Sequence, residues 1–156
     1  MRRKDREVAD FHEQLAIIKK CDVCRIALND EDGFPYIVPM NFGMDVQDGQ
    51  LYFYFHCATE GKKLDLIRKD NRAFFEMDCN HNLVSNAETM SCSMGYESVM
   101  GRGTLAFIAE DEKLDALKIL MRQYHSGDFP INIARIPATT VLRMTVTEMT
   151  GKRRII

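Results

Sequence analysis

Apolar residues recur along the chain with two different periods, and the alternation between these periods predicts where helices and strands lie. Between residues 5 and 20, Val8, Phe11, Leu15 and Ile18 are spaced by three or four positions, a pattern typical of an amphipathic helix. A similar stripe predicts a helix over residues 110–124, and a short helical pattern occupies residues 62–69.

Six further runs are continuously apolar or alternate between apolar and polar residues, as in strands: 21–28, 34–44, 51–55, 72–77, 97–108 and 140–147. Polar turns at 29–33 and 46–50, both containing glycine, predict hairpins. Pro39 has no N–H to donate. We therefore expect its stretch to lie at a sheet edge, at a bulge, or where something other than protein pairs with the backbone.

Residues 78–96 are polar and irregular, and they predict a long loop that lines a functional site. Antiparallel strands accompanied by only a few helices favour a barrel over a doubly wound parallel sheet. No dinucleotide fingerprint and no Walker loop occur. At 156 residues, the chain is expected to form a single domain over 1–156.

Composition narrows the class of protein without identifying it. The chain is 46% hydrophobic and 28% charged, which is ordinary for a globular protein, and its net charge of -2 gives no overall footprint for nucleic acid. No apolar run is long enough for a membrane span and no export signal is recognisable, so we expect a soluble, cytoplasmic protein.

Five cysteines are an odd number in a chain expected to remain in a reducing compartment, so we expect free thiols. Cys21 and Cys24 have the spacing of a redox pair or of half a zinc site. Cys24 falls inside a predicted strand and no second CxxC pair exists, which makes that alternative weaker.

Polar chemistry concentrates where the strand at 51–55 gives way to the helix at 62–69. The strand ends in His56, and the chain then turns through Gly61 into Lys62 and Lys63. Free N–H groups at a helix start with lysines beside them form a seat for a phosphate. The alternative is a buried strand followed by an ordinary solvated helix start.

Three segments in the same order resemble a known family: PYIVPMNFG at 35–43, LYFYFHCA at 51–58 with Gly61-Lys62-Lys63, and SVMGRG at 98–103. Together they resemble the pyridoxamine 5'-phosphate oxidase-related, FMN-binding split-barrel family, most closely its 5-nitroimidazole resistance branch. The resemblance implies a mainly β fold with flanking helices, a six-stranded antiparallel split barrel. It also implies a homodimer with two FMN sites at the interface.

The resemblance assigns site residues by position. The stretch along the flavin ring consists of Val38, Pro39, Met40, Asn41 and Phe42. The corner near the ribityl phosphate consists of His56, Cys57, Ala58, Lys62 and Lys63, with Lys63 the stronger phosphate ligand and Lys62 the more solvated. Tyr96 and Ser98 are implied to reach the partner subunit's flavin. Arg25 either faces the cofactor or forms a structural ion pair.

The implied activity is that of an FMN-dependent oxidoreductase that reduces a small acceptor such as a nitroimidazole. His56 then either holds a proton for the reaction or only terminates the strand. The competing hypothesis is a module of the same fold that binds flavin or haem without turnover. Pyridoxamine-phosphate oxidation is a weaker third, because the arginine- and lysine-rich substrate motifs associated with that enzyme are missing.

Overall fold

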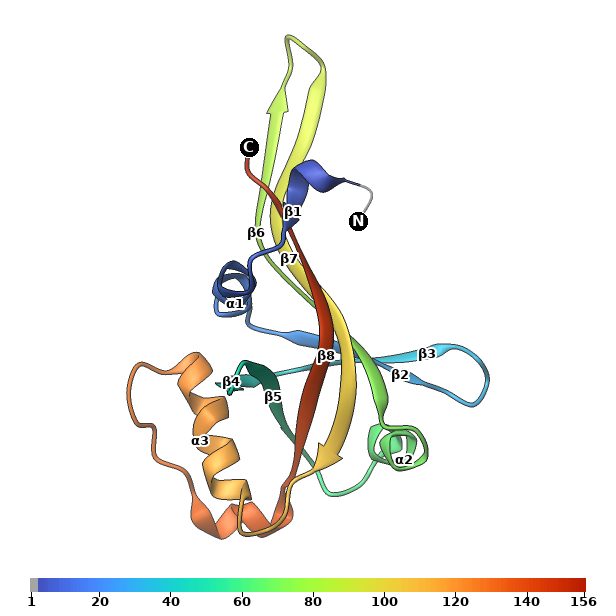
Figure 1. Ribbon diagram of the computed structural model, residues 1–156, viewed down its shortest axis with the longest axis vertical. Helices are drawn as coiled ribbons and strands as arrows, with labels where there is room; N and C mark the ends of the chain where they lie inside the picture. Colours follow the sequence, from blue (N-terminus) through green and yellow to red (C-terminus); the bar gives the residue numbers. More distant parts are fainter. Residues whose placement is uncertain (1–2) are drawn as a thin grey trace.

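The computed structural model describes residues 3–156 and consists of one extensive antiparallel sheet with three α-helices (Figure 1). The strands are β1 (Glu7–Val8), β2 (Cys24–Asn29), β3 (Pro35–Met40), β4 (Gly43–Gln47), β5 (Gln50–Cys57), β6 (Arg72–Asn86), β7 (Ser91–Phe107) and β8 (Thr140–Arg154). The helices are α1 (Phe11–Ile18), α2 (Lys62–Lys69) and α3 (Lys113–Tyr124), with 3₁₀ turns η1 (Lys4–Arg6) and η2 (Ile133–Ala138).

The strands are hydrogen-bonded in the order β3-β2-β6-β7-β8-β5-β4, with β1 added to β8. The two ends of this order, β3 and β4, are joined by Asn41 and Phe42, so the sheet curls around until its edges meet at one corner without pairing. This is a split barrel, as expected. Eight strands replace the expected six because 34–44 divides at this corner into β3 and β4, and because residues 7–8 form β1.

The barrel interior is filled by aliphatic and aromatic side chains from most of the strands. Phe53 of β5 lies at its centre, with its ring edge-on to Phe42 and Phe75 at centroid distances of 5.8 and 5.0 Å. Helices α1 and α2 contribute buried leucines and isoleucines to this cluster. Helix α3 lies outside the barrel and packs on the opposite side of β5 through Ala116 and Tyr54.

The first helix is shorter than the expected span of 5–20. It begins after Asp10, whose side chain accepts a hydrogen bond from the Glu13 N–H, and it ends at Ile18. Val8 belongs instead to β1, where it pairs with Gly151. Its apolar side chain therefore reaches the core from a strand.

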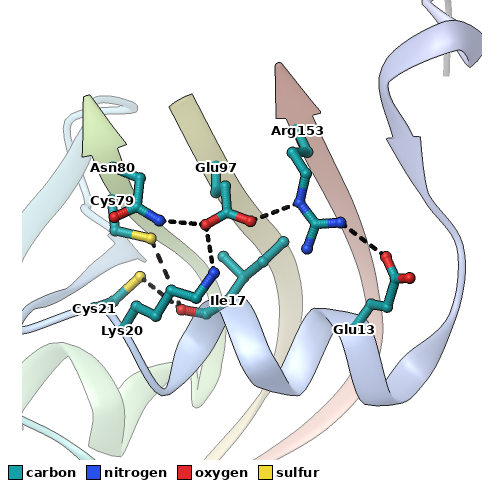
Figure 2. Close-up of polar contacts among 8 residues, drawn as sticks. All are labelled: Glu13, Ile17, Lys20, Cys21, Cys79, Asn80, Glu97 and Arg153. Carbon is teal, nitrogen blue, oxygen red and sulfur yellow. Dashed lines mark hydrogen bonds and ion pairs between the residues drawn. The ribbon is translucent and has the colours of Figure 1, made fainter. Parts of the chain in front are cut away.

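A buried carboxylate ties α1 to the sheet (Figure 2). Glu97 of β7 accepts hydrogen bonds from Lys20 at 2.7 Å, from Arg153 at 2.6 Å and from Asn80 at 2.5 Å. Arg153 extends the network to Glu13 on the helix. Burial alone raises the pKa of Glu97, but its hydrogen bonds with Lys20, Arg153 and Asn80 outweigh this effect and lower it overall.

The expectation of an irregular loop over 78–96 is wrong. These residues continue β6 and β7 as a two-stranded ribbon, paired from Asn82 opposite Gly95 to Asn86 opposite Ser91, which extends past the rest of the sheet (Figure 1). The ribbon gave no strand signal because both of its faces are exposed, so no period-two apolar pattern marks it. We call residues 80–95 the arm.

Candidate functional site

The corner between β5 and α2 has the features of an anion-binding site. Gly61 precedes α2 with a φ of 132°, a conformation suited to glycine, and it provides no side chain to cap the helix. The first N–H groups of α2 therefore stay available to a ligand. Lys63 is half-buried beside His56 and Cys57. Burial lowers the pKa of His56 and Lys63 adds to this effect, whereas burial raises the pKa of Cys57 and Lys63 only opposes it.

Lys62 is the more exposed of the two lysines, as expected, but it also forms an ion pair within the protein. Its ammonium lies 2.5 Å from a carboxylate oxygen of Asp30 and 5.0 Å from the centre of the Tyr36 ring. Asp30 belongs to the β2–β3 turn and Tyr36 to β3. Lys62 therefore holds the start of α2 against β3 and leaves Lys63 as the cation of this corner without an ion-pair partner among the described residues.

His56 stands at the end of β5 with its side chain outside the barrel. Burial is the main cause of its lowered pKa, and the nearby Lys63 cation adds to the effect. The imidazole is therefore largely neutral near neutral pH. It lines a cavity of about 330 Å³ whose other walls are mainly apolar side chains of α3 and the segment up to η2, including Leu117, Met121 and Ile136.

Strand β3 has one free edge. It pairs with β2 from Pro35 opposite Asn29 to Met40 opposite Cys24, and no other described strand pairs with it. Its other edge therefore leaves N–H and C=O groups without ladder partners, interrupted at Pro39, which has no N–H. The expectation that Pro39 lies at a sheet edge is confirmed.

Side chains alternate along the stretch expected to follow the flavin ring. Val38, Met40 and Phe42 point into the barrel core, whereas Pro39 and Asn41 are exposed. A ligand on the free edge would therefore meet the main chain of this stretch and few of its side chains. A flat ring with its own donors and acceptors fits such an edge, and a phosphate fits the start of α2 beside it.

Tyr124, at the end of α3, holds the β3–β4 corner in place. Its hydroxyl accepts a hydrogen bond from the Phe42 N–H at 2.9 Å and donates one to the Asp22 carbonyl at 2.8 Å. Asp30 and Tyr124 position the candidate site, yet sequence reasoning missed both. Each acts on residues far away in sequence, and no local pattern marks such a contact.

Tyr96 and Ser98 are not brought to the corner within one chain. Ser98 lies opposite Lys152 on β8 and His56 lies opposite Val141 on the same strand, so the two are separated by roughly 35 Å of extended chain. Burial alone raises the pKa of Tyr96, but its hydrogen bonds with Lys152 and Arg6 outweigh this effect and lower the pKa overall. Arg25 forms ion pairs with Glu76 and Asp78 on the outer face of the sheet.

Other polar groups offer no second site of the expected kinds. Residues 3–156 contain no cluster of three or more histidine, cysteine or acidic side chains able to hold a metal ion. Cys21 and Cys24 are both buried free thiols, and burial raises their pKa values. None of the helices in these residues is long and apolar enough to cross a membrane.

Comparison with known proteins gives a consistent picture. Residues 10–153 match the pyridoxamine 5'-phosphate oxidase family. A solved structure described as a candidate 5-nitroimidazole antibiotic resistance protein from Bacteroides thetaiotaomicron is 34% identical, with a TM-score of 0.81 over 94% of this chain and 85% of that one. No curated protein matches the chain.

Two more distant structures share the fold. A flavocytochrome from Azotobacter vinelandii is 19% identical, with a TM-score of 0.79 over 100% of this chain and 72% of that one. An FAD- and haem-binding protein from Mycobacterium smegmatis is also 19% identical, with a TM-score of 0.79 over 95% of this chain and 73% of that one. At this level of identity, the likeness extends to the fold alone.

Proposed function

Because the chain belongs to the pyridoxamine 5'-phosphate oxidase family, with residues 10–153 matching it, we propose that it is an FMN-dependent oxidoreductase that reduces a small acceptor such as a nitroimidazole. The observation that carries the proposal is the pairing of two features at one place. The free edge of β3 and the uncapped start of α2 are held together by Lys62, which contacts both Asp30 and Tyr36.

In this proposal, each feature binds a different part of the cofactor. Lys63 and the first N–H groups of α2 bind the phosphate, and the main chain of Val38 to Phe42 lies along the ring. Cys57, the last residue of β5, and Ala58 after it lead from His56 towards the start of α2 and belong to the phosphate corner. The bound flavin would supply two-electron chemistry, while the protein supplies orientation and charge.

His56 has the properties of a proton-handling group. Its imidazole is neutral near neutral pH because burial and Lys63 lower its pKa, so it accepts or relays a proton at the wall of the apolar cavity. The walls of the cavity are mainly apolar, and its volume of about 330 Å³ is within the range of small-ligand pockets.

The proposed assembly is a homodimer. Along β8, Ser98 and Tyr96 lie roughly 35–45 Å from the position opposite His56, so they would meet a phosphate corner only across a subunit interface. Each of the two sites would then combine the corner of one chain with Tyr96 and Ser98 of the other.

The phosphate role is tested by titrating FMN into the flavin-free protein and following the quenching of flavin fluorescence. Loss of a charge-assisted contact worth about 1.5–3 kcal/mol predicts that Lys63→Ala weakens FMN binding by roughly 10- to 150-fold. Lys69→Ala, on the same helix and paired with Glu31, serves as the matched control and should change it little. Riboflavin has no phosphate and should bind wild type and Lys63→Ala equally. Equal FMN affinity of Lys63→Ala and wild type would remove Lys63 from the site.

The reaction is tested by reducing the reconstituted protein without oxygen and adding a nitroimidazole. The flavin absorbance should recover as electrons pass to the drug, and His56→Gln should slow this recovery without a matching loss of FMN affinity. Absence of recovery, in protein that holds FMN and accepts reductant, would contradict the enzyme assignment.

The second candidate is a binding module for flavin or haem without turnover. It is favoured by the neutral imidazole of His56 at an apolar cavity, which is also what a haem ligand requires. The absorbance spectrum of the purified protein separates the two candidates. A Soret band that shifts in His56→Gln would support haem binding.

A further inference from the structure

Two of the five free thiols lie close together where α1 packs on β6 (Figure 2). Cys21 follows the end of α1, and Cys79 belongs to β6, far along the chain. Both Sγ atoms lie against the main-chain carbonyl oxygen of Ile17, at 3.4 Å from Cys21 and 3.9 Å from Cys79. A single acceptor therefore brings together two thiols from elements that are distant in sequence.

The two thiols also interact with each other. Burial is the main cause that raises the pKa of both, and hydrogen bonding between them adds to the rise at Cys21 but opposes it at Cys79. The pair therefore favours loss of the proton from Cys79, with the Cys21 S–H as donor to the thiolate. Sulfur atoms within hydrogen-bonding range need only a small movement to reach the length of a disulfide bond, about 2.05 Å.

The two positions differ in their access to solvent. Cys21 is 2% exposed, whereas Cys79 is only partly buried, so a small oxidant meets Cys79 first. A partly exposed thiol with a second thiol behind it is the arrangement in which a sulfenic acid is converted to a disulfide. The raised pKa of Cys79 keeps its thiolate scarce near neutral pH, so the reaction is expected to be slow.

The spacing of Cys21 and Cys24 indicated a different pair. Cys24 lies within β2, and its side chain is 0% exposed in the barrel core. An oxidant would reach Cys24 only if the core opened. The partner that the fold offers to Cys21 is therefore Cys79.

We propose that Cys21 and Cys79 form a disulfide bond when hydrogen peroxide oxidises the protein. The bond would link the end of α1 to β6 at the base of the arm. The pairing of β6 with β7 is already irregular there, between Cys79 and Asn82, which eases a small movement of Cys79. Neither cysteine belongs to the residues assigned to the flavin, so the proposed function and this modification stand or fall separately.

The oxidation takes two steps and transfers two electrons to the peroxide. The Cys79 thiolate attacks a peroxide oxygen, the O–O bond breaks, and the departing hydroxide takes up a proton to form water. Cys79 is then a sulfenic acid. The Cys21 sulfur attacks the Cys79 sulfur, the S–O bond breaks, and the Cys21 proton leaves with the hydroxide as a second water. One peroxide is reduced to two waters while two thiols are oxidised to one disulfide.

The proposal is tested on reduced, full-length protein by adding hydrogen peroxide, blocking the remaining thiols in denaturant and identifying joined peptides by mass spectrometry. The reference protein and every variant carry Cys92→Ser, which removes an exposed thiol able to link separate chains. The peptides that contain Cys21 and Cys79 should be joined, with a mass about 2 Da below their sum. A dithiol reductant should separate them again.

Single substitutions separate the roles of the thiols. Cys21→Ser should abolish the joined peptides and leave a sulfenic acid on Cys79, which dimedone traps. Cys79→Ser should abolish both products, because Cys21 is buried. Cys24→Ala, which removes another buried thiol, is the matched control and should leave the yield of joined peptides unchanged. Circular dichroism checks the fold of each variant, and the joined peptides of the reference protein are a test that needs no variant at these positions.

The pH dependence of the rate identifies the attacking group. Burial is the largest influence on the pKa of Cys79; Cys21 and Lys20 favour the thiolate, whereas Glu97 and Asp78 oppose it. Because the resulting pKa is above its ordinary value, the rate of linkage should rise about tenfold between about pH 7 and about pH 8. A rate independent of pH would contradict attack by the Cys79 thiolate.

Three outcomes would overturn the proposal. The first is that Cys21 is joined to Cys24 and not to Cys79. The second is that Cys79 is oxidised to a sulfinic acid in the reference protein without any linkage to Cys21. The third is that no joined peptides form at a peroxide concentration that fully oxidises free cysteine.

Discussion

At the scale of single residues, His56 makes the free energy of unfolding depend on pH. Its pKa in the folded protein is lowered by burial and by Lys63, whereas an unfolded histidine titrates near 6.5. The unfolded state therefore binds the proton more readily, and stability falls as the pH drops below about 6.5. We expect His56→Gln to lose less stability than wild type between about pH 7 and about pH 5 in urea unfolding. Equal losses would contradict this expectation.

The pKa of Glu97 is lowered, whereas burial would raise the pKa of an unpaired acid. Its lowered pKa means that it stabilises the folded chain above its unfolded value, near 4.3, and that this contribution is lost as the pH falls. Glu97→Gln should lower the free energy of unfolding near neutral pH by about 2 kcal/mol, because it weakens charged hydrogen bonds with Lys20 and Arg153. Urea unfolding measures the loss. Glu88→Gln, at an exposed position, should have no comparable effect.

Contacts of single residues could be predicted from the sequence only where the residues are close together in the chain. The neighbourhood of His56, Gly61 and Lys63 follows from their closeness in sequence, and the structure indeed holds them at one corner. The capture of Lys62 by Asp30 could not be foreseen, because these residues meet only once the β2–β3 turn lies beside α2. The same reason hid Tyr124, which reaches across 82 positions to Phe42.

At the scale of elements, the position of α3 depends on one glycine. A side-chain carbon on Gly43 of β4 would lie 2.4 Å from the Leu120 Cα, far inside any contact distance. Gly43→Ala should therefore push α3 away from the sheet and lower the free energy of unfolding by about 1–3 kcal/mol. Gly95→Ala, where the nearest atom lies 3.3 Å away, is the comparison and should cost less in the same measurement. Equal losses would show that the close approach of Gly43 to Leu120 does not fix the position of α3.

Elements were predictable where at least one of their faces is buried. The strand around Phe53 and Phe55 has a long apolar run, and the helix around Ala116 and Leu120 has a clear stripe. The arm and the second half of β8 expose much of both faces, so the alternation that marks a strand is absent. The sequence-based expectation for β8 ended at Thr147 for that reason, seven residues before Arg154.

At the scale of the whole molecule, the proposed dimer ties stability to concentration. Because unfolding of a homodimer releases two chains, the midpoint of thermal unfolding should rise with protein concentration. We expect an increase of about 2 °C for each tenfold increase in wild-type concentration. A wild-type midpoint independent of concentration would indicate that the chain unfolds as a monomer.

The placement of β8 has a consequence for how the protein is made. This strand lies between β7 and β5, so it joins two parts of the sheet that are otherwise connected only through the β3–β4 corner. While the ribosome is still synthesising residues 58–139, β5 has β4 on one side and no partner on the other. A nascent chain would thus present an open strand edge, with Phe53 and Phe55 on the same strand, until Val141 to Thr145 emerge. Chaperones that bind exposed apolar strands would therefore act mainly before β8 has been translated.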